Sequence, residues 1–306
     1  MELREYLRSL EEERKRGSTE FRERSPLVKF PLMKMQDDYY YYSILTLLNS
    51  LENFVYDTLR STKSQEFMSI FGLMFERYVE RGMKHLGEDF LTESVIMRRA
   101  GGAKTVDYAV LGGHANILID AKGVEMTHGG MTSHRPEVIT GQAKSSVLKR
   151  IRQGVETARM LAKDEPTRWI RDRNFLLVVT FKDLYLGTGA EFFSYVVQDR
   201  VTSALGAPAE ESIIPLEHMY FMSIDEFDYL VEALRRNNMT LEALLREVVV
   251  ADRNSETKCL QISQHLVRRW GGLSAPAYIV EEFDAMFARA ARALGAEGVG
   301  SQQGRR

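Results

Sequence analysis

The stretch VDYAVLGGHANILIDAKG, residues 106–123, contains two apolar runs separated by a pair of glycines. Apolar runs of this length on either side of a Gly-Gly turn predict a β-hairpin. Asp107 lies near the start of the first run, and Asp120 and Lys122 lie at the end of the second. Because the two strands of a hairpin run in opposite directions, the three charged side chains are expected at the same end of the sheet.

The charged residues of this hairpin indicate a type of chemistry. Two carboxylates placed close together repel each other unless a cation lies between them, and a hard divalent cation such as Mg²⁺ or Mn²⁺ suits oxygen ligands. A neighbouring lysine can activate a water molecule or offset the charge that develops on a phosphate. The hairpin therefore predicts metal-assisted phosphodiester hydrolysis centred on Asp107, Asp120 and Lys122. The alternative is a simple ion pair between Asp120 and Lys122 at the end of a strand.

The composition excludes several classes of protein. The chain of 306 residues suits one large domain or two modest ones. Its 41 basic and 43 acidic residues nearly cancel, so any nucleic-acid binding must come from a local patch. Cys259 is the only cysteine, which excludes an intramolecular disulfide and a CxxC zinc site. A charged N-terminus, and no apolar run near the roughly 20 residues of a membrane span, predict a cytoplasmic protein without a membrane segment.

Two helices are predicted before the hairpin. Residues 37–59 carry apolar side chains at helical spacing, and the tyrosine run at 39–42 is expected to pack against the core rather than stack on bases. Residues 66–86 form a second helix with a broad apolar stripe. Glu76 lies among these apolar residues, and a carboxylate in such a place needs a partner or a metal ion.

The remaining pattern predicts a mixed α/β protein. Strands are expected at 90–97, 106–111, 116–121 and 174–181, with a helix at 144–161 between the last two. The resulting order is α-β-β-β-α-β. Farther along, we expect a strand at 219–222 and helices at 191–205, 224–237, 240–250, 261–270 and 281–294. The division expected is an N-terminal helical region (1–64), a core (65–185), a mainly helical C-terminal region (186–294) and a disordered tail (295–306), although the later helices can equally wrap around the sheet.

At this point the residues resemble the PD-(D/E)XK nuclease superfamily, which has the restriction-endonuclease-like fold. Asp107 matches the first acidic residue of its motif, Asp120 the second, and Lys122 the lysine. The resemblance covers about residues 65–181 and implies an α-β-β-β-α-β core with a mixed sheet, with helical additions at both ends. The chain has Val106 where the name of the motif has proline.

The resemblance also implies roles for residues outside the hairpin. A glutamate on the helix before the sheet often joins the metal site, and Glu76 holds that position. A glutamine on the helix after the third strand would orient the attacking water that Lys122 assists, and Gln153 fits. Thr157 stands where some exonuclease branches have tyrosine, so that branch is not assigned. The implied ligands of one or two Mg²⁺ or Mn²⁺ ions are Glu76, Asp107, Asp120 and the backbone carbonyl of Ala121.

A local basic patch is the expected contact for nucleic acid. Its residues on the helix after the hairpin are Lys144, Lys149, Arg150 and Arg152, and Lys104 precedes the hairpin. The alternative is a solvated helix face.

These observations lead to one expected function and two competitors. The first is a metal-dependent nuclease that cuts DNA rather than RNA, serves in bacterial defence against phage or plasmids, and works as a homo-oligomer or with a partner ATPase or helicase. The second is an inactive protein of the same fold that serves as a binding or scaffold subunit. The third is a metal-dependent hydrolase of a nucleotide-sized phosphate ester.

Overall fold

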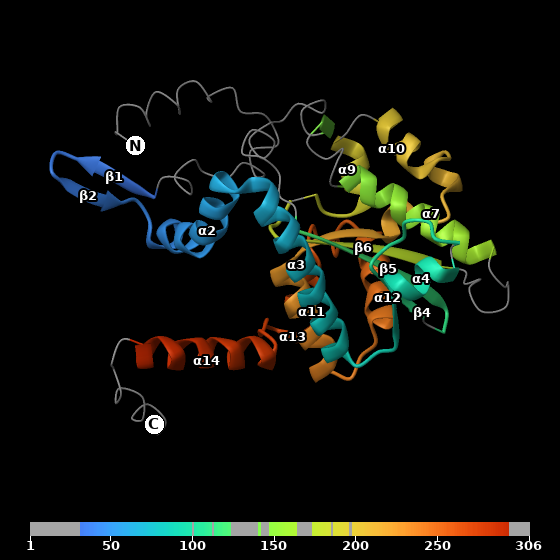
Figure 1. Ribbon diagram of the computed structural model, residues 1–306. Coiled ribbons are helices and arrows are strands. Elements are labelled where there is room, and N and C mark those ends of the chain that lie inside the picture. The colour runs from blue at the N-terminus through green and yellow to red at the C-terminus, as the bar shows by residue number, and fades with distance from the viewer. Residues whose placement is uncertain are drawn as a thin grey trace.

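A mixed sheet of five strands lies at the centre of the fold (Figure 1). The computed structural model describes residues 31–99, 101–111, 113–123, 140–141, 147–163, 173–184, 186–195 and 198–293. The strands follow their chain order across the sheet: β3 (Phe90–Thr92), β4 (Tyr108–Leu111), β5 (Ala115–Lys122), β6 (Arg173–Thr180) and β7 (Met219–Ser223). The first three are antiparallel neighbours, and β5, β6 and β7 are parallel. The expected α/β class is therefore confirmed.

The predicted hairpin is present as β4 and β5. Tyr108 is the register partner of Ile119, and Leu111 is the partner of Asn116. All residues of β5 except its last are buried, because the strand lies inside the sheet and has a helical layer on each face.

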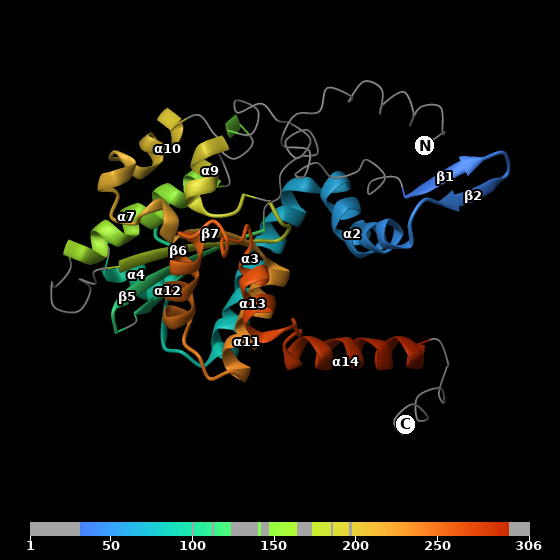
Figure 2. The ribbon, with the colours of Figure 1, turned by 180° about the vertical axis from the view of Figure 1, so that it is seen from behind.

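Helices cover both faces of the sheet (Figures 1 and 2). The apolar cluster on one face involves α4 (Glu93–Arg99), α7 (Lys149–Lys163), α9 (Gly189–Tyr195) and α10 (Gln198–Leu205). The cluster on the other face involves α3 (Ser64–Leu86), α11 (Ile224–Arg236), α12 (Leu241–Asp252) and α13 (Ile262–Trp270). Along β5, Leu118 belongs to the first cluster and Ile119 to the second, as period-two alternation requires.

The chain order contains the predicted helix, three strands, helix and strand as α3, β3, β4, β5, α7 and β6, with α4 inserted. The apolar cluster that includes α3 extends past residue 185, because it contains both Phe75 of α3 and Phe227 of α11. The later strand β7 likewise pairs with β6 in the same sheet.

Several predicted boundaries were wrong. The strand predicted at 90–97 ends at Thr92, and α4 begins at Glu93, where only Ile96 of the helix is fully buried. The helix predicted at 191–205 is two helices, α9 and α10. The predicted helix at 144–161 is described from residue 147, with α7 at Lys149–Lys163. The predicted tail at 295–306 lies outside the described residues.

The tyrosine run was assigned to the wrong element and the wrong environment. Residues 38–41 form β2 (Asp38–Tyr41), which pairs with β1 (Leu32–Met35) in a separate two-stranded sheet. The helix α2 (Ile44–Thr62) begins only afterwards. The four tyrosines are 49% to 72% exposed. Aromatic side chains favour strands. This hairpin lies away from the core, so the tyrosines do not pack against the core as the helical prediction required.

Two helices extend from the core on the same side of the molecule (Figures 1 and 2). They are α2, near the start of the described chain, and α14 (Ala277–Ala293), at its end. We call them the arm helices. Within the described ranges, none of the helices has the length and apolarity needed to cross a membrane.

Candidate functional site

The end of the β4–β5 hairpin is fastened by Asp107. Its Oδ2 accepts a hydrogen bond from the backbone N–H of Ala121, at 2.6 Å. Asp107 directly precedes β4, and Ala121 lies between Asp120 and Lys122 on β5. The predicted first acidic residue is therefore held directly against the segment that carries the other two charged residues.

Asp120 is fully buried and forms an ion pair with a residue of α7. Arg150 Nε lies 3.2 Å from Asp120 Oδ2, and Arg150 Nη1 lies 3.4 Å from Asp120 Oδ1. The Nε–Oδ2 contact is poorly aligned, so both of these buried atoms lack a well-formed hydrogen bond. A buried carboxylate is costly without a compensating charge, and here the guanidinium supplies it.

Gln153 continues the network toward the segment before β4. Its Oε1 accepts a 2.9 Å hydrogen bond from Arg150 Nη1, and its Nε2 donates to the backbone carbonyl of Thr105. One turn later, Thr157 Oγ1 accepts from the N–H of Val106 and donates to the Gln153 carbonyl. Gln153 is therefore buried, and both ends of its side-chain amide are hydrogen-bonded.

Glu76 reaches the same region from α3. Its backbone carbonyl accepts a 2.7 Å hydrogen bond from the Tyr108 hydroxyl, which ties this turn of α3 to the start of β4. Burial raises the pKa of its carboxyl, while the nearby charge of Lys122 lowers it and that of Glu93 raises it. We call Glu76, Asp107, Asp120 and Lys122 the hairpin-end cluster.

The carboxylates of this cluster act on one another. Burial, and then the charge of Asp120, raise the pKa of Asp107 to about 8, and Glu76 adds to the rise. Burial raises the pKa of Asp120 to about 6, against the opposing effect of Arg150 and Lys122. Raised values of this kind mean that the ionised carboxylates lack sufficient positive charge around them. A proton or a bound cation would relieve the repulsion.

The chemistry of the donor set fits a hard divalent cation. Three carboxylates repel one another, and Asp120 Oδ2 has no aligned donor. In the described part of the chain, however, no three His, Cys, Asp or Glu side chains are close enough together to hold a metal ion. At Asp120, the guanidinium of Arg150 lies 3.2 Å from Oδ2. The carboxylates would have to turn toward one another to share an ion.

The expected basic patch is only partly supported by the positions of its members. Lys104, Lys149 and Arg152 are exposed, and Lys144 lies outside the described residues. Arg150 was wrongly placed in this exposed patch: it is buried and faces the sheet, because Asp120 draws its guanidinium inward. Its chemical role is therefore at the hairpin-end cluster.

Sequence reasoning missed two charged groups of this site. One is the guanidinium of Arg150, which pairs with Asp120. The other is Glu93, at the start of α4, whose charge raises the pKa of both Glu76 and Asp107. A signal existed for the first: Arg150 and Gln153 are three residues apart on a helix and so share a face. No sequence signal distinguished Glu93.

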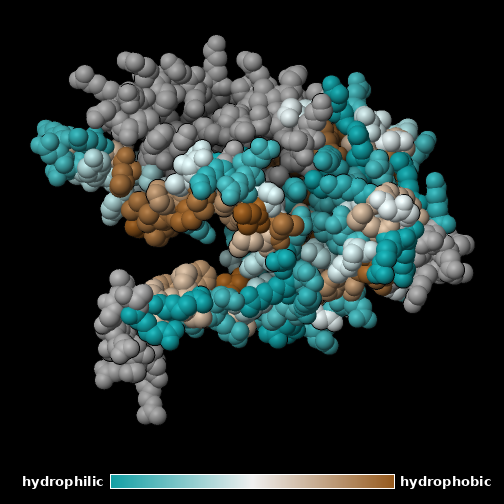
Figure 3. Space-filling view, viewed as in Figure 1, coloured by the Kyte–Doolittle hydropathy of each residue, from teal (hydrophilic) through white to brown (hydrophobic). Residues whose placement is uncertain are grey.

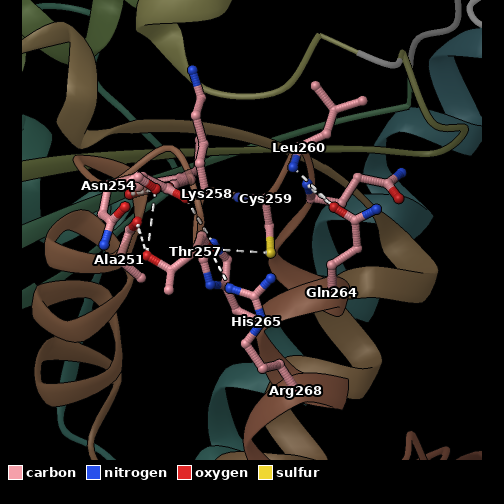
Figure 4. Close-up of polar contacts among 12 residues, drawn as sticks. Ala251, Asn254, Thr257, Lys258, Cys259, Leu260, Gln264, His265 and Arg268 are labelled. Carbon is pink, nitrogen blue, oxygen red and sulfur yellow. Dashed lines mark hydrogen bonds and ion pairs between the residues drawn. The ribbon is translucent and has the colours of Figure 1, made fainter.

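A second polar cluster ties the end of α12 to α13 (Figure 4). His265 Nε2 lies 2.8 Å from Asp252 Oδ1, which also accepts a hydrogen bond from the N–H of Cys259. The Cys259 thiol lies 3.6 Å from the carbonyl of Thr257, and burial raises its pKa. A buried thiol with a raised pKa is a poor nucleophile.

Comparison with protein-family models, with curated proteins and with solved structures finds no match for this chain. The functional argument therefore rests on the hairpin-end cluster and its neighbours. That cluster combines mutually repelling carboxylates with a lysine and a buried arginine. These groups suit chemistry on an anionic substrate.

Proposed function

We propose that this protein is a metal-dependent nuclease that hydrolyses phosphodiester bonds, in DNA rather than RNA. The observation that supports the proposal is the electrostatic coupling of three carboxylates: the charges of Asp120 and Glu76 raise the pKa of Asp107, and the charge of Glu76 raises the pKa of Asp120. The nearby charge of Lys122 lowers the pKa of both Glu76 and Asp120, so the lysine belongs to the same cluster. Three carboxylates and a lysine are the groups that metal-assisted phosphodiester hydrolysis needs.

The residues in and beside the cluster would have different roles in the reaction. A bound Mg²⁺ or Mn²⁺ would supply Lewis-acid polarisation of the phosphate and a more acidic water. Glu76, Asp107, Asp120 and the Ala121 carbonyl would be its ligands. Lys122 would place positive charge beside the phosphate as negative charge develops on it. Gln153 would hold Arg150 in place through their 2.9 Å hydrogen bond.

A second candidate function, a binding or scaffold subunit without catalysis, is favoured by one observation. Arg150 already neutralises Asp120 at 3.2 Å, so this carboxylate has a stable partner without any metal ion. Asp107 differs: burial raises its pKa, and the charges of Asp120, Glu76 and Glu93 add to the rise. A scaffold function therefore accounts for the ion pair of Asp120, but it does not account for the placing of the other carboxylates near it.

The test is cleavage by the purified full chain. Supercoiled plasmid, linear duplex, single-stranded DNA and RNA would each be incubated with Mg²⁺ or Mn²⁺. We expect DNA to be cut, and Asp120→Asn and Lys122→Ala each to lower the rate by at least about 100-fold, the size typical for loss of one acid–base or charge-stabilising group.

Matched controls separate loss of chemistry from loss of folding. Asp228→Asn changes another buried aspartate, which accepts hydrogen bonds from two tyrosines, and Lys258→Ala changes a lysine paired with Glu191. Both should cleave at the wild-type rate. Equal cleavage by wild type and the two site variants would refute the assignment. Folded wild type that cuts no substrate would favour the scaffold function.

A further inference from the structure

The arm helix α2 carries a continuous apolar seam on its exposed side. The seam residues follow one another at spacings of four, three and four residues and are 51% to 65% exposed: Ile44, Leu48, Leu51 and Val55. This alternation of four and three places them on one face and is the spacing of helices that pair with other helices. The core-facing side of the same helix is occupied by Tyr56, which packs on Phe71 and Phe181.

The arm helix α14 has the same feature. Val280, Phe283 and Phe287 are spaced three and four residues apart and are at least half exposed. Its first two turns are anchored: the Tyr278 hydroxyl donates a 2.9 Å hydrogen bond to Asp228 Oδ1, and Glu282 pairs with Arg81. The helix thus has a fixed base and an apolar seam that the described part of the chain leaves exposed.

The helices α2 and α14 lie on either side of an open gap (Figure 3). In this view, apolar surface covers the side of α2 that borders the gap, and a paler apolar strip follows the opposing side of α14. The start of α3 adds Ile70, Leu73 and Met74, which are 55% to 61% exposed.

The apolar area is that of a stable interface. Ten large apolar side chains that are half exposed or more, each presenting about 100 Å², offer on the order of 1,000 Å² per copy. A standard interface buries about 800 Å² per partner. The apolar side chains of α2, α14 and the start of α3 together therefore offer enough area for a dimer.

We infer that two copies of this chain form a closed twofold dimer through their arm helices, with α14 of each copy packed against α2 of the other. The occupant that suits these seams is a helix with a matching four-three apolar seam. The chain itself has two such helices, anchored at their bases and projecting from one side, and a twofold axis would bury both seams of both copies. The inference does not depend on the proposed nuclease function.

The test is the mass of the full chain in solution, by sedimentation or light scattering. Wild type should have twice the 35.1 kDa mass of one chain. Val55→Glu combined with Phe283→Glu should weaken dimerisation by more than about 100-fold, because each charge would be buried in the apolar interface. The matched control is Val250→Glu on α12, since Val250 is 67% exposed and Val55 is 65% exposed; this control should stay dimeric.

Circular dichroism of each variant distinguishes loss of the dimer from loss of the fold, and all should keep the wild-type helix content because the changed residues are exposed. A wild type that is monomeric throughout the micromolar range would overturn the inference. So would a dimer that the arm substitutions leave intact, or a monomer whose arms instead bind lipid vesicles.

Discussion

Glu226 on α11 is a buried carboxylate outside the hairpin-end cluster, and only one of its oxygens is well satisfied. Its Oε1 accepts hydrogen bonds from the N–H and hydroxyl of Ser263, at 3.2 and 2.8 Å. Its Oε2 is buried and has no hydrogen-bond partner among the residues that the structure describes. Burial, together with the charge of Asp183, raises its pKa to about 7. The fold therefore favours the protonated form of this carboxyl group.

The substitution Glu226→Gln should raise the free energy of unfolding at neutral pH. The folded pKa of about 7 lies above the ordinary value of 4.5, so between these pH values the folded state holds more protons than the unfolded state. Wild-type stability consequently falls as pH rises through this window, by up to about 1.4 kcal/mol per pH unit. The glutamine does not titrate, and its single amide oxygen can still accept from Ser263.

Denaturant unfolding at pH 5, 6, 7 and 8 would measure this effect. The advantage of Glu226→Gln over wild type should grow up to about pH 7 and then level off. Glu256→Gln, at an exposed position, serves as the control and should give a constant difference. A difference for Glu226→Gln that stays constant over the whole range would contradict the prediction.

Single residues of the candidate site differ in how far sequence alone could predict them. Asp107 and Asp120 were identifiable because the hairpin pattern fixes which ends of the two strands meet. Arg150 was not, because sharing a helix face with Gln153 does not by itself reveal which of several basic residues faces a buried carboxylate. Burial of a guanidinium depends on a partner from a distant segment, here β5, and no local pattern records that partner.

The packing of α3 against α11 depends on a glycine. A Cβ atom built on Gly82 would lie 2.5 Å from the ring of Phe227, which is almost completely buried and cannot move aside. Ten residues earlier on the same helix, a Cβ on Gly72 meets nothing within 4 Å. The same helix therefore contains one glycine that the packing requires and one that it does not.

Gly82→Ala should lower stability by about 1–3 kcal/mol, because overpacking outweighs the better helix propensity of alanine. Gly72→Ala should raise it by up to about 1 kcal/mol, since only the propensity changes. Urea unfolding of both variants beside wild type gives the comparison. Equal effects at the two sites would show that close contact with Phe227 does not limit the approach of the two helices.

At the level of elements, local pattern predicted the central sheet better than its surroundings. The strands β4, β5 and β6 follow from apolar runs that are buried on both faces. The short β3 and the helix α4 were merged into one strand, because an apolar run of this length suits either element and only Ile96 turns fully into the core. The tyrosine run was misassigned for a related reason: its side chains pair within a hairpin that has no core beneath it.

The arm helices show what sequence cannot reveal about the whole molecule. An apolar stripe at helical spacing on α2 or α14 predicts burial, but it does not say whether the covering surface belongs to the same chain. The exposed side chains Leu51 and Phe283 show that the described part of this chain does not cover them. Where a stripe is anchored at one end and open along its length, the missing surface is expected from another molecule.

A dimer held by the arm helices should make the melting temperature depend on protein concentration. If folded dimers unfold to separate chains, each tenfold rise in concentration adds about 1.4 kcal/mol per dimer and raises Tm by about 1 °C for a molecule of this size. Val55→Glu with Phe283→Glu should abolish this dependence, whereas Val250→Glu should keep it. Scanning calorimetry over two decades of concentration measures the slope. A wild-type Tm that does not change with concentration, or a slope that the arm substitutions leave unaltered, would mean that stability does not derive from association through these helices.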